Sequence, residues 1–387
     1  MNRKDPVPNG RPSSNHSSSK YPLVALGAGI TALCVLVLVV AMHFGGGVFF
    51  ERKAPDPGRS SITTDSNATT GSTISDAGSF PTVSSTPTPI PPSPTPDAAQ
   101  IEALTADLRE VEFALLYQEI TEFLDAQTGR YSLYYINLSN GETIAYKETE
   151  KMVAASTIKL PVNTYLYQLV AAGEVSLDEI RTYDSRKYPT GDRHGGYGII
   201  QDAANGTEYT LEELSKLSIR TSDNTATRMI LRRIGDYDVV YDHFMEPISS
   251  VVDYCAYVTY RDKNGISKTA NHRTSAIDMA LYMVELYRLY SESPADYEGL
   301  IHDLCNTDYP WGISQGLPEG TNIAHKIGVI KALGVNNDVA IVFGQEDFVL
   351  CVMSETFDEA KARANIGEVS RMVYDYIQCF APTASAD

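Results

Sequence analysis

The spacing of hydrophobic residues predicts a folded domain that begins near residue 100 and continues to the end of the chain. Apolar residues recur every three or four positions across 101–124, which is typical of an amphipathic helix. Residues 131–138 are aromatic and β-branched, and a Ser-Asn-Gly turn joins them to 142–146, so a β-hairpin is expected there. The other predicted elements are helices at 156–171, 211–218, 224–234, 274–291 and 359–379, and strands at 322–330, 339–343 and 348–352.

The order of these elements indicates the fold class. Two strands come before most of the helices and three come after them, which fits one sheet that combines strands from both ends of the domain. Helices on the faces of such a sheet would bury its apolar side chains. We therefore predict an α+β domain with three layers, α/β/α, over residues 100–387.

The segment before this domain has the features of a membrane anchor. Residues 22–42 contain no charged side chain, and about 20 apolar residues suffice for a helix to span a bilayer. Four basic residues precede this segment against one acid, which favours a cytoplasmic N-terminus. We predict a cytoplasmic tail at 1–20, a transmembrane helix at 21–44 and a single-pass protein of the cell membrane with an extracytoplasmic domain. The alternative is a cleaved signal peptide, although its apolar core of about 7–15 residues would be shorter.

Composition and charge complete the organisation. Pro, Ser and Thr dominate residues 45–99, and such a segment cannot bury enough apolar surface to fold, so it is predicted to be a disordered linker. The whole chain of 387 residues has a formal net charge of -18. This acidic balance argues against nucleic acid as a partner, because the phosphates would be repelled.

Three short stretches of the folded part carry candidate chemistry. Ser156 and Lys159 are three residues apart at the start of a predicted helix, so the amine can reach the hydroxyl and act as its base. A Ser-Asp-Asn sequence at 222–224 precedes another predicted helix, and Lys326 lies on a predicted strand. Each stretch alone has a structural explanation, because serine and aspartate cap helices and lysine protects strand edges.

Together and in this order, the three stretches resemble the signature of penicillin-recognising active-site serine enzymes: Ser-x-x-Lys, Ser-Asp-Asn and Lys-Thr-Gly. With the segments at 316–320 and 337–340, the chain resembles the class A β-lactamase-like serine hydrolase family over roughly residues 100–380. The resemblance implies a β-lactamase/transpeptidase-like antiparallel sheet with a helical lobe.

The resemblance also implies roles for individual residues. The implied catalytic residues are Ser156 as the nucleophile, Lys159 as its base, and Ser222 as the group that passes a proton to the leaving nitrogen. The implied substrate-binding residues are Asn224, Lys326, Gly328 and Val329. The backbone N–H groups of Ser156 and Val329 would form the oxyanion hole, whereas Asp223 would be structural. No metal or other cofactor is expected, because serine chemistry requires none.

Two departures from the family pattern matter. Ile327 stands where the family has Thr or Ser, so recognition of a substrate carboxylate would rest more on Lys326. The glutamate that activates the deacylating water is missing, because residues 254–271 contain a single acid, Asp262. Glu246 comes too early in the chain, and it and Asp262 are the two candidate substitutes. Slow deacylation of an acylated serine is therefore expected.

Two functions remain open from the sequence. The first is a hydrolase of β-lactamase or D-alanyl-D-alanine carboxypeptidase type, whose partner is a small-molecule β-lactam or a peptidoglycan stem peptide. The second is a degenerate member that binds such molecules without turnover. The intact motifs favour the hydrolase, whereas the two departures favour the binding protein. Tyr197, which follows two glycines, is a candidate for the rim of the pocket.

Overall fold

The computed structural model describes residues 97–188, 197–249, 259–261, 267–269 and 272–380. The predicted cytoplasmic tail, the predicted membrane helix at 21–44 and nearly all of the predicted linker lie outside these ranges. Among the helices that the structure describes, none combines the length and the apolar character needed to cross a membrane. All three candidate motif stretches fall within the described ranges.

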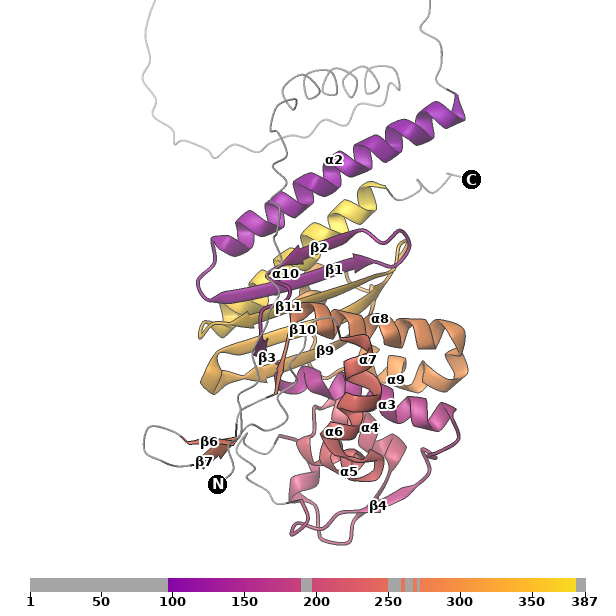
Figure 1. The fold of residues 1–387 in the computed structure, drawn as a ribbon, viewed down its shortest axis with the longest axis vertical. Coiled ribbons are helices and arrows are strands. Elements are labelled where there is room, and N and C mark those ends of the chain that lie inside the picture. The colour runs from indigo at the N-terminus through magenta and orange to yellow at the C-terminus, as the bar shows by residue number, and fades with distance from the viewer. Residues whose placement is uncertain (1–96, 189–196, 250–258, 262–266, 270–271, 381–387) are drawn as a thin grey trace, which may run out of the picture. The chain divides into compact units, whose positions relative to one another are not determined.

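A five-stranded antiparallel sheet joins the two ends of the folded domain (Figure 1). The strand order β2-β1-β11-β10-β9 places the early hairpin beside the late strands, as the sequence predicts. The strands, taken across the sheet, are β2 (Thr143–Tyr146), β1 (Arg130–Asn137), β11 (Phe348–Glu355), β10 (Val335–Phe343) and β9 (Asn322–Ile330). β9 is therefore an edge strand of this sheet, and one of its long sides is open to contact with the helical lobe.

Strand β10 begins earlier than the hydrophobic pattern predicts. Its first half contains Asn336, Asn337 and Asp338, all of which are buried. The backbone of this half pairs with both neighbouring strands, and the Ser354 N–H donates to Asn337 Oδ1 at 3.1 Å. Polar residues that are buried and hydrogen-bonded give no alternating hydrophobic signal, so the prediction missed them.

Helices cover both faces of the sheet, which confirms the predicted three layers (Figure 1). Along β11, Leu350 and Val352 pack into a hydrophobic cluster with α2 and α10, whereas Val349, Cys351 and Met353 pack toward the opposite helices. The helices nearest the sheet are α2 (Ala98–Asp125) and α10 (Glu359–Cys379) on one face, and α3 (Lys159–Ala171), α8 (Ala276–Glu292) and α9 (Pro294–Cys305) on the other.

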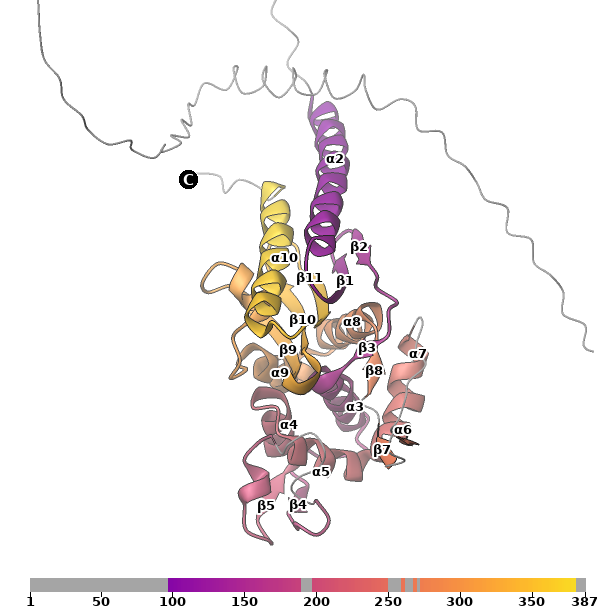
Figure 2. The same ribbon diagram turned by 90° about the vertical axis from the view of Figure 1, so that its left-hand side faces the viewer.

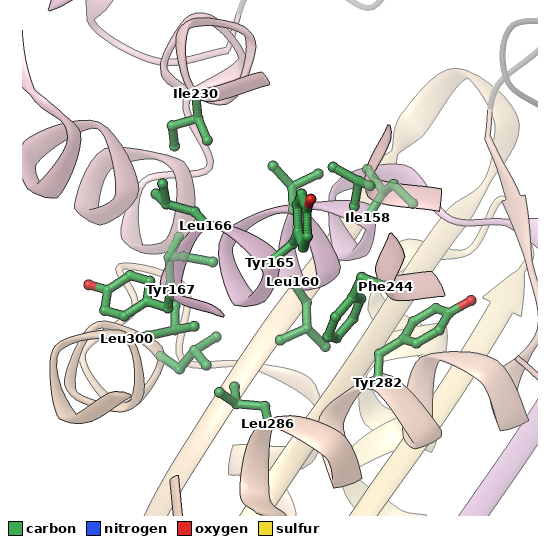
Figure 3. Packing of buried hydrophobic residues seen from close by; sticks show 14 of the residues in the cluster. Ile158, Leu160, Tyr165, Leu166, Tyr167, Ile230, Phe244, Tyr282, Leu286 and Leu300 are labelled. Carbon is green, nitrogen blue, oxygen red and sulfur yellow. The ribbon is translucent and has the colours of Figure 1, made fainter. Parts of the chain in front are cut away.

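The chain between the hairpin and β9 forms a helical lobe around α3. Residues 159–167 of α3 are all buried, and a helix that is buried on every side is surrounded by other elements. Figure 3 shows Leu160 and Tyr167 of α3 among side chains from the neighbouring helices. The remaining helices and turns of the lobe are η1 (Ala155–Ile158), η2 (Ile200–Asp202), α4 (Leu211–Arg220), α5 (Asn224–Ile234), α6 (Asp236–Val240), the π turn η3 (Tyr241–Met245) and α7 (Glu246–Ile248).

Short paired strands and turns complete the described chain. The sequence did not predict these short strands, because two or three residues are too few for a periodic pattern. They are β3 (Met152–Val153) with β8 (Arg273–Thr274), β4 (Ile180–Thr182) with β5 (Glu208–Thr210), and β6 (Thr259–Arg261) with β7 (Ser267–Thr269). Two 3₁₀ turns, η4 (Gly312–Gly316) and η5 (Lys331–Leu333), flank β9 in the sequence.

Candidate active site

The peptide segment that leads into Ser156 is held from two sides. On one side, β3 pairs with β8, and the N–H of Ala154 donates to the carbonyl of His272 at 2.9 Å. On the other side, Asn337 Nδ2 on β10 donates to the carbonyl oxygens of Val153 at 2.8 Å and Ala154 at 3.2 Å. The sheet and the helical lobe therefore both fix the residues directly before the candidate nucleophile.

Gly328 brings the backbone of β9 against the amide of Ser156. A Cβ atom at Gly328 would lie 2.8 Å from the Ala154 carbonyl oxygen and 3.1 Å from the Ser156 nitrogen. Only a glycine fits here without a shift of backbone atoms. Ala155, between these two contacts, has φ 52°, a left-handed conformation that is strained for a residue with a side chain. The structure thus places Gly328 beside the backbone of Ser156, the candidate nucleophile.

Lys159 is a buried amine that faces the 222–224 segment. Its Nζ donates to the backbone carbonyl and the Oγ of Ser222, the latter at 3.1 Å, and to Asn224 Oδ1 at 2.8 Å. Within the described residues its hydrogen bonds go to this segment, and the expected direct bond to Ser156 Oγ is not formed. Burial, together with the positive charge of Lys326, holds the pKa of Lys159 well below its usual value. A lowered pKa favours the neutral amine, which is the form that can accept a proton.

Asp223 fixes the turn that carries Ser222. Its Oδ1 accepts hydrogen bonds from the backbone N–H groups of Thr225 at 2.8 Å and Ala226 at 2.9 Å, which caps α5. Its Oδ2 accepts from the Ile200 N–H at 3.0 Å. Asp223 is completely buried, so its carboxylate serves the fold, as predicted. Ser222 itself has φ 59° and is held in this strained conformation by the cap.

Lys326 approaches Ser222 from β9 on the other side. Its Nζ donates to Ser222 Oγ at 3.2 Å and to the Ile327 carbonyl at 3.2 Å. Complete burial lowers the pKa of Lys326 to about 7, although the charge of Asp338 acts in the opposite direction. The Ser222 hydroxyl therefore lies between two buried amines, one from α3 and one from the sheet.

The side chain of Ile327 lies in the hydrophobic cluster between the sheet and α10, not in the cluster of the helical lobe. It is buried in the cluster that includes Ile313 and Ala340, toward α10. A buried pair that the sequence did not predict lies close by, where His325 Nδ1 is 3.1 Å from Asp338 Oδ1. Asp338 Oδ2 also accepts from the Ile313 N–H at 2.9 Å. The sequence offered only the Asn-Asp segment at 337–340 as a signal for this pair.

Two tyrosines stand beside the Ser222 turn. The Tyr197 side chain is exposed, and its backbone carbonyl accepts from the Asn224 N–H at 2.9 Å. The Tyr309 hydroxyl oxygen lies 3.0 Å from the Tyr197 hydroxyl oxygen and 3.2 Å from the Thr221 carbonyl oxygen. The sequence suggested Tyr197 as a rim residue but gave no indication of Tyr309.

Neither candidate substitute for the deacylating glutamate is seen at this site. Glu246 is an exposed residue at the start of α7, a short helix that packs on α8 and η3. Asp262 lies outside the described residues. Among the described residues, the site therefore contains groups suited to acyl transfer but no carboxylate assigned to activating water.

This geometry defines a class of protein. A serine that follows a strained residue, a buried amine with a lowered pKa three residues further along the chain, and a second serine that connects two amines are the parts of a serine acyl-transfer site. The sequence profile of the β-lactamase enzyme family matches residues 115–377 of the chain. The chain therefore belongs to this family of class A β-lactamase-like serine hydrolases, which confirms the resemblance seen in the motifs.

Individual relatives agree with this assignment. The chain is 27% identical over 243 residues to a β-lactamase of Bacillus licheniformis, covering 62% of this chain and 74% of that protein. It is similar to the structure of a Leu-to-Glu variant of PBP-A, solved as an acyl-enzyme complex with penicillin G, with 27% identity, a TM-score of 0.58 and coverage of 69% and 97%. An ancestral class A β-lactamase shares the fold, with 23% identity, a TM-score of 0.57 and coverage of 67% and 99%.

Proposed function

We propose that this protein is a membrane-anchored, extracytoplasmic serine hydrolase that is acylated by β-lactams or by cell-wall stem peptides and deacylates slowly. One observation carries the proposal: Ser222 Oγ lies 3.1 Å from Lys159 Nζ and 3.2 Å from Lys326 Nζ. A hydroxyl between two buried amines can relay a proton toward a leaving nitrogen.

Acylation would use the residues in the following way. Ser156 Oγ attacks the carbonyl carbon of the substrate amide, and its proton passes to the neutral amine of Lys159. The N–H groups of Ser156 and Val329 stabilise the oxyanion. The C–N bond then breaks, and the leaving nitrogen takes a proton from the Ser222 hydroxyl. Lys159 in turn gives the proton it accepted to Ser222. The ammonium of Lys326 attracts the substrate carboxylate.

Deacylation would be the slow step, because water needs a base to attack the acyl-serine ester. The expected glutamate is missing from the sequence, and Glu246 is exposed on α7. The likeness to PBP-A, a variant of which was solved as an acyl-enzyme with penicillin G, supports a fold that can hold this intermediate. The second candidate function, binding without turnover, is favoured by the same missing base.

A fluorescent penicillin distinguishes these functions. The full chain is expected to form a covalent adduct at Ser156, located by peptide mass spectrometry, that persists after free penicillin is removed. Ser156→Ala abolishes the adduct, whereas Ser291→Ala, which changes an exposed serine on α8, leaves it intact. Failure to form an adduct at any concentration would leave the binding function. Nitrocefin turnover well above that of Ser156→Ala would contradict slow deacylation.

The same chain tests the cell-wall substrate. Release of D-alanine from a synthetic peptide ending in D-alanyl-D-alanine is expected at a low rate that requires Ser156. If penicillin acylates the protein but no D-alanine is released, the carboxypeptidase proposal fails while the acylation proposal stands.

Membrane anchoring is proposed from the apolar segment at 21–44. The full chain is expected in the membrane fraction after alkaline carbonate extraction, with the domain open to protease from outside the cell. A variant that lacks residues 1–50 is expected to leave the membrane fraction. A processed product that starts after this segment would indicate a cleaved signal peptide instead.

A further inference from the structure

Helix α2 has two apolar sides, and the domain uses one of them. On that side, Leu116, Ile120 and Leu124 are buried against the α10 layer. The Phe113 ring on the same side lies 5.7 Å from the ring of Tyr376. The other side carries five residues, here named the outer stripe: Ile101, Leu104, Leu108, Val111 and Leu115. Leu108 is half-buried, and the other four are 43–52% exposed.

The outer stripe is a concentration of exposed apolar surface. Of the ten large hydrophobic side chains that are exposed in the described part of the chain, five lie on α2. In Figure 2, the first turns of α2 extend beyond the end of α10. The family match starts at residue 115, so most of the stripe precedes the family domain. Most of the stripe therefore lies on the part of α2 that precedes the matched region, and its exposed side chains form a patch on one side of a single helix.

The spacing of the stripe indicates what would cover it. Steps of three, four, three and four residues place Ile101, Leu108 and Leu115 at a positions of a heptad, and Leu104 and Val111 at d positions. This 3.5-residue repeat is the seam along which two helices supercoil. Packing along the stripe would stabilise this part of α2, because most helical stability in proteins comes from packing of an apolar face. The partner is therefore a helix with a matching seam.

Charge argues against a lipid surface as the partner. The exposed part of α2 carries four acidic residues, Glu102, Asp107, Glu110 and Glu112. Arg109, the one basic residue among them, is held by Glu142 and Glu346. Anionic headgroups would repel this helix.

We propose that two copies of this chain associate through the outer stripe of α2 as a parallel, in-register coiled coil. An a and d seam is self-complementary, so an identical stripe provides the partner that the spacing requires. In both copies the same 96 residues precede the described helix. If both copies are anchored in one membrane as proposed, the two helices start from the same side of that membrane and run in the same direction. Two chains in one membrane also meet at a high effective concentration. The pairing does not depend on the proposed enzymatic activity.

Cysteine crosslinking tests both pairing and direction. In a parallel pair the d position Leu104 faces Leu104 of the second copy, whereas in an antiparallel pair it faces an a position such as Leu108. Leu104→Cys is expected to give a disulfide-linked dimer of the full chain on mild oxidation. Ala106→Cys, exposed on the far side of α2, is the matched control, and both variants are made with Cys34, Cys255 and Cys379 replaced by Ser. Equal crosslinking at both positions, or none at Leu104, would overturn the proposal.

A second measurement does not rely on added cysteines. Native mass spectrometry of the full chain in detergent is expected to show dimers, which the double change Leu104→Asp and Leu108→Asp converts to monomers. Fluorescent penicillin labelling of this variant, unchanged from the parent, would show that the domain is still folded. A labelled variant that remains dimeric would overturn the proposal. Because labelling and dimerisation are read separately, failure of one is distinguishable from failure of the other.

Discussion

Two buried amines share one hydroxyl at the centre of the site, and they cannot both carry a proton easily. Lys159 and Lys326 approach Ser222 Oγ at 3.1 and 3.2 Å, and burial makes two like charges at this separation costly. The pKa of Lys159 lies well below its usual value, and that of Lys326 is about 7. These shifts support the proposed division of roles, in which Lys159 is the base and Lys326 carries the positive charge below about pH 7.

This division predicts the pH dependence of acylation. Because burial lowers the pKa of Lys326 to about 7, its ammonium is present below that pH and is lost as the pH rises through it. The second-order rate constant for penicillin labelling is therefore expected to fall as the pH rises above about 7, since attraction of the substrate carboxylate weakens. Labelling time courses at a series of pH values measure this decrease in the rate constant. In Lys326→Arg the side chain stays charged, so the rate constant should no longer fall over this pH range. If the rate constant of Lys326→Arg still falls with pH, a group other than Lys326 causes the decrease.

Asn337 is a positioning residue that acts through the backbone before Ser156. In Asn337→Leu the carbonyls of Val153 and Ala154 lose their donor, and buried carbonyls without partners cost about 1–3 kcal/mol of stability. A displaced nucleophile can slow acylation by about 100-fold. The rate of acylation at saturating penicillin should fall, while the concentration needed for half-saturation stays nearly constant. Asn336→Leu is the control, because its Oδ1 has no partner in the described structure. Equal effects of both substitutions would refute the positioning role.

At the scale of elements, the proposed oxyanion hole depends on the long-range packing of β9 against η1. Gly328 allows this contact, and Gly328→Ala would place a methyl group 2.8 Å from the Ala154 oxygen and 3.1 Å from the Ser156 nitrogen. Both are backbone atoms, so β9 must move away from the nucleophile. We expect a folded protein whose penicillin labelling is at least about 100-fold slower.

The control for this substitution is Gly344→Ala. Its added Cβ would meet only the Glu346 carbonyl oxygen at 3.9 Å, and its backbone has no left-handed φ. Circular dichroism and thermal unfolding check that both variants fold. If Gly328→Ala labels as fast as Gly344→Ala, the close approach of β9 to Ser156 is not needed for acylation.

The elements also show what the sequence could and could not predict. Long periodic helices such as α2 and α10, and the central apolar strands, follow directly from hydrophobic spacing. The start of β10 did not, because Asn336, Asn337 and Asp338 are buried polar residues that give no hydrophobic signal. The pair β3 and β8 was too short to detect, yet it holds the segment before Ser156. Motif order identified Ser222 and Lys326, whereas Asn337 acts through contacts with residues far away in the sequence.

At the scale of the whole domain, the site exists only where three parts of the chain meet. Ser156 and Lys159 come from the entry to the lobe, Ser222 from the turn between α4 and α5, and Lys326 from the late strand β9. The sheet joins the first and last of these parts, because β1 pairs with β11 and β11 with β10. Both hydrophobic layers must therefore form before the amines converge on Ser222.

Assembly of two copies adds one further test, based on charge beside the α2 seam. In a parallel pair the g position Asp107 of one helix faces the e position Glu112 of the other, and two such acidic contacts repel. Glu112→Lys turns both into attractive pairs, and at about 0.2–1 kcal/mol each the two pairs should lower the dimer dissociation constant roughly 2–30-fold. Analytical ultracentrifugation at several salt concentrations measures the change.

The salt response distinguishes this seam from a general effect of net charge. Added salt should tighten the parent dimer by screening repulsion and loosen the Glu112→Lys dimer by screening attraction. Glu110→Lys makes the same change in net charge at an exposed c position away from the seam, and it should leave the salt response of the parent nearly unchanged. If both lysine variants behave alike, the charges act only through the overall charge of the chain and the proposed register is wrong. In an antiparallel pair the e positions face each other, so Glu112→Lys would exchange one repulsion for another.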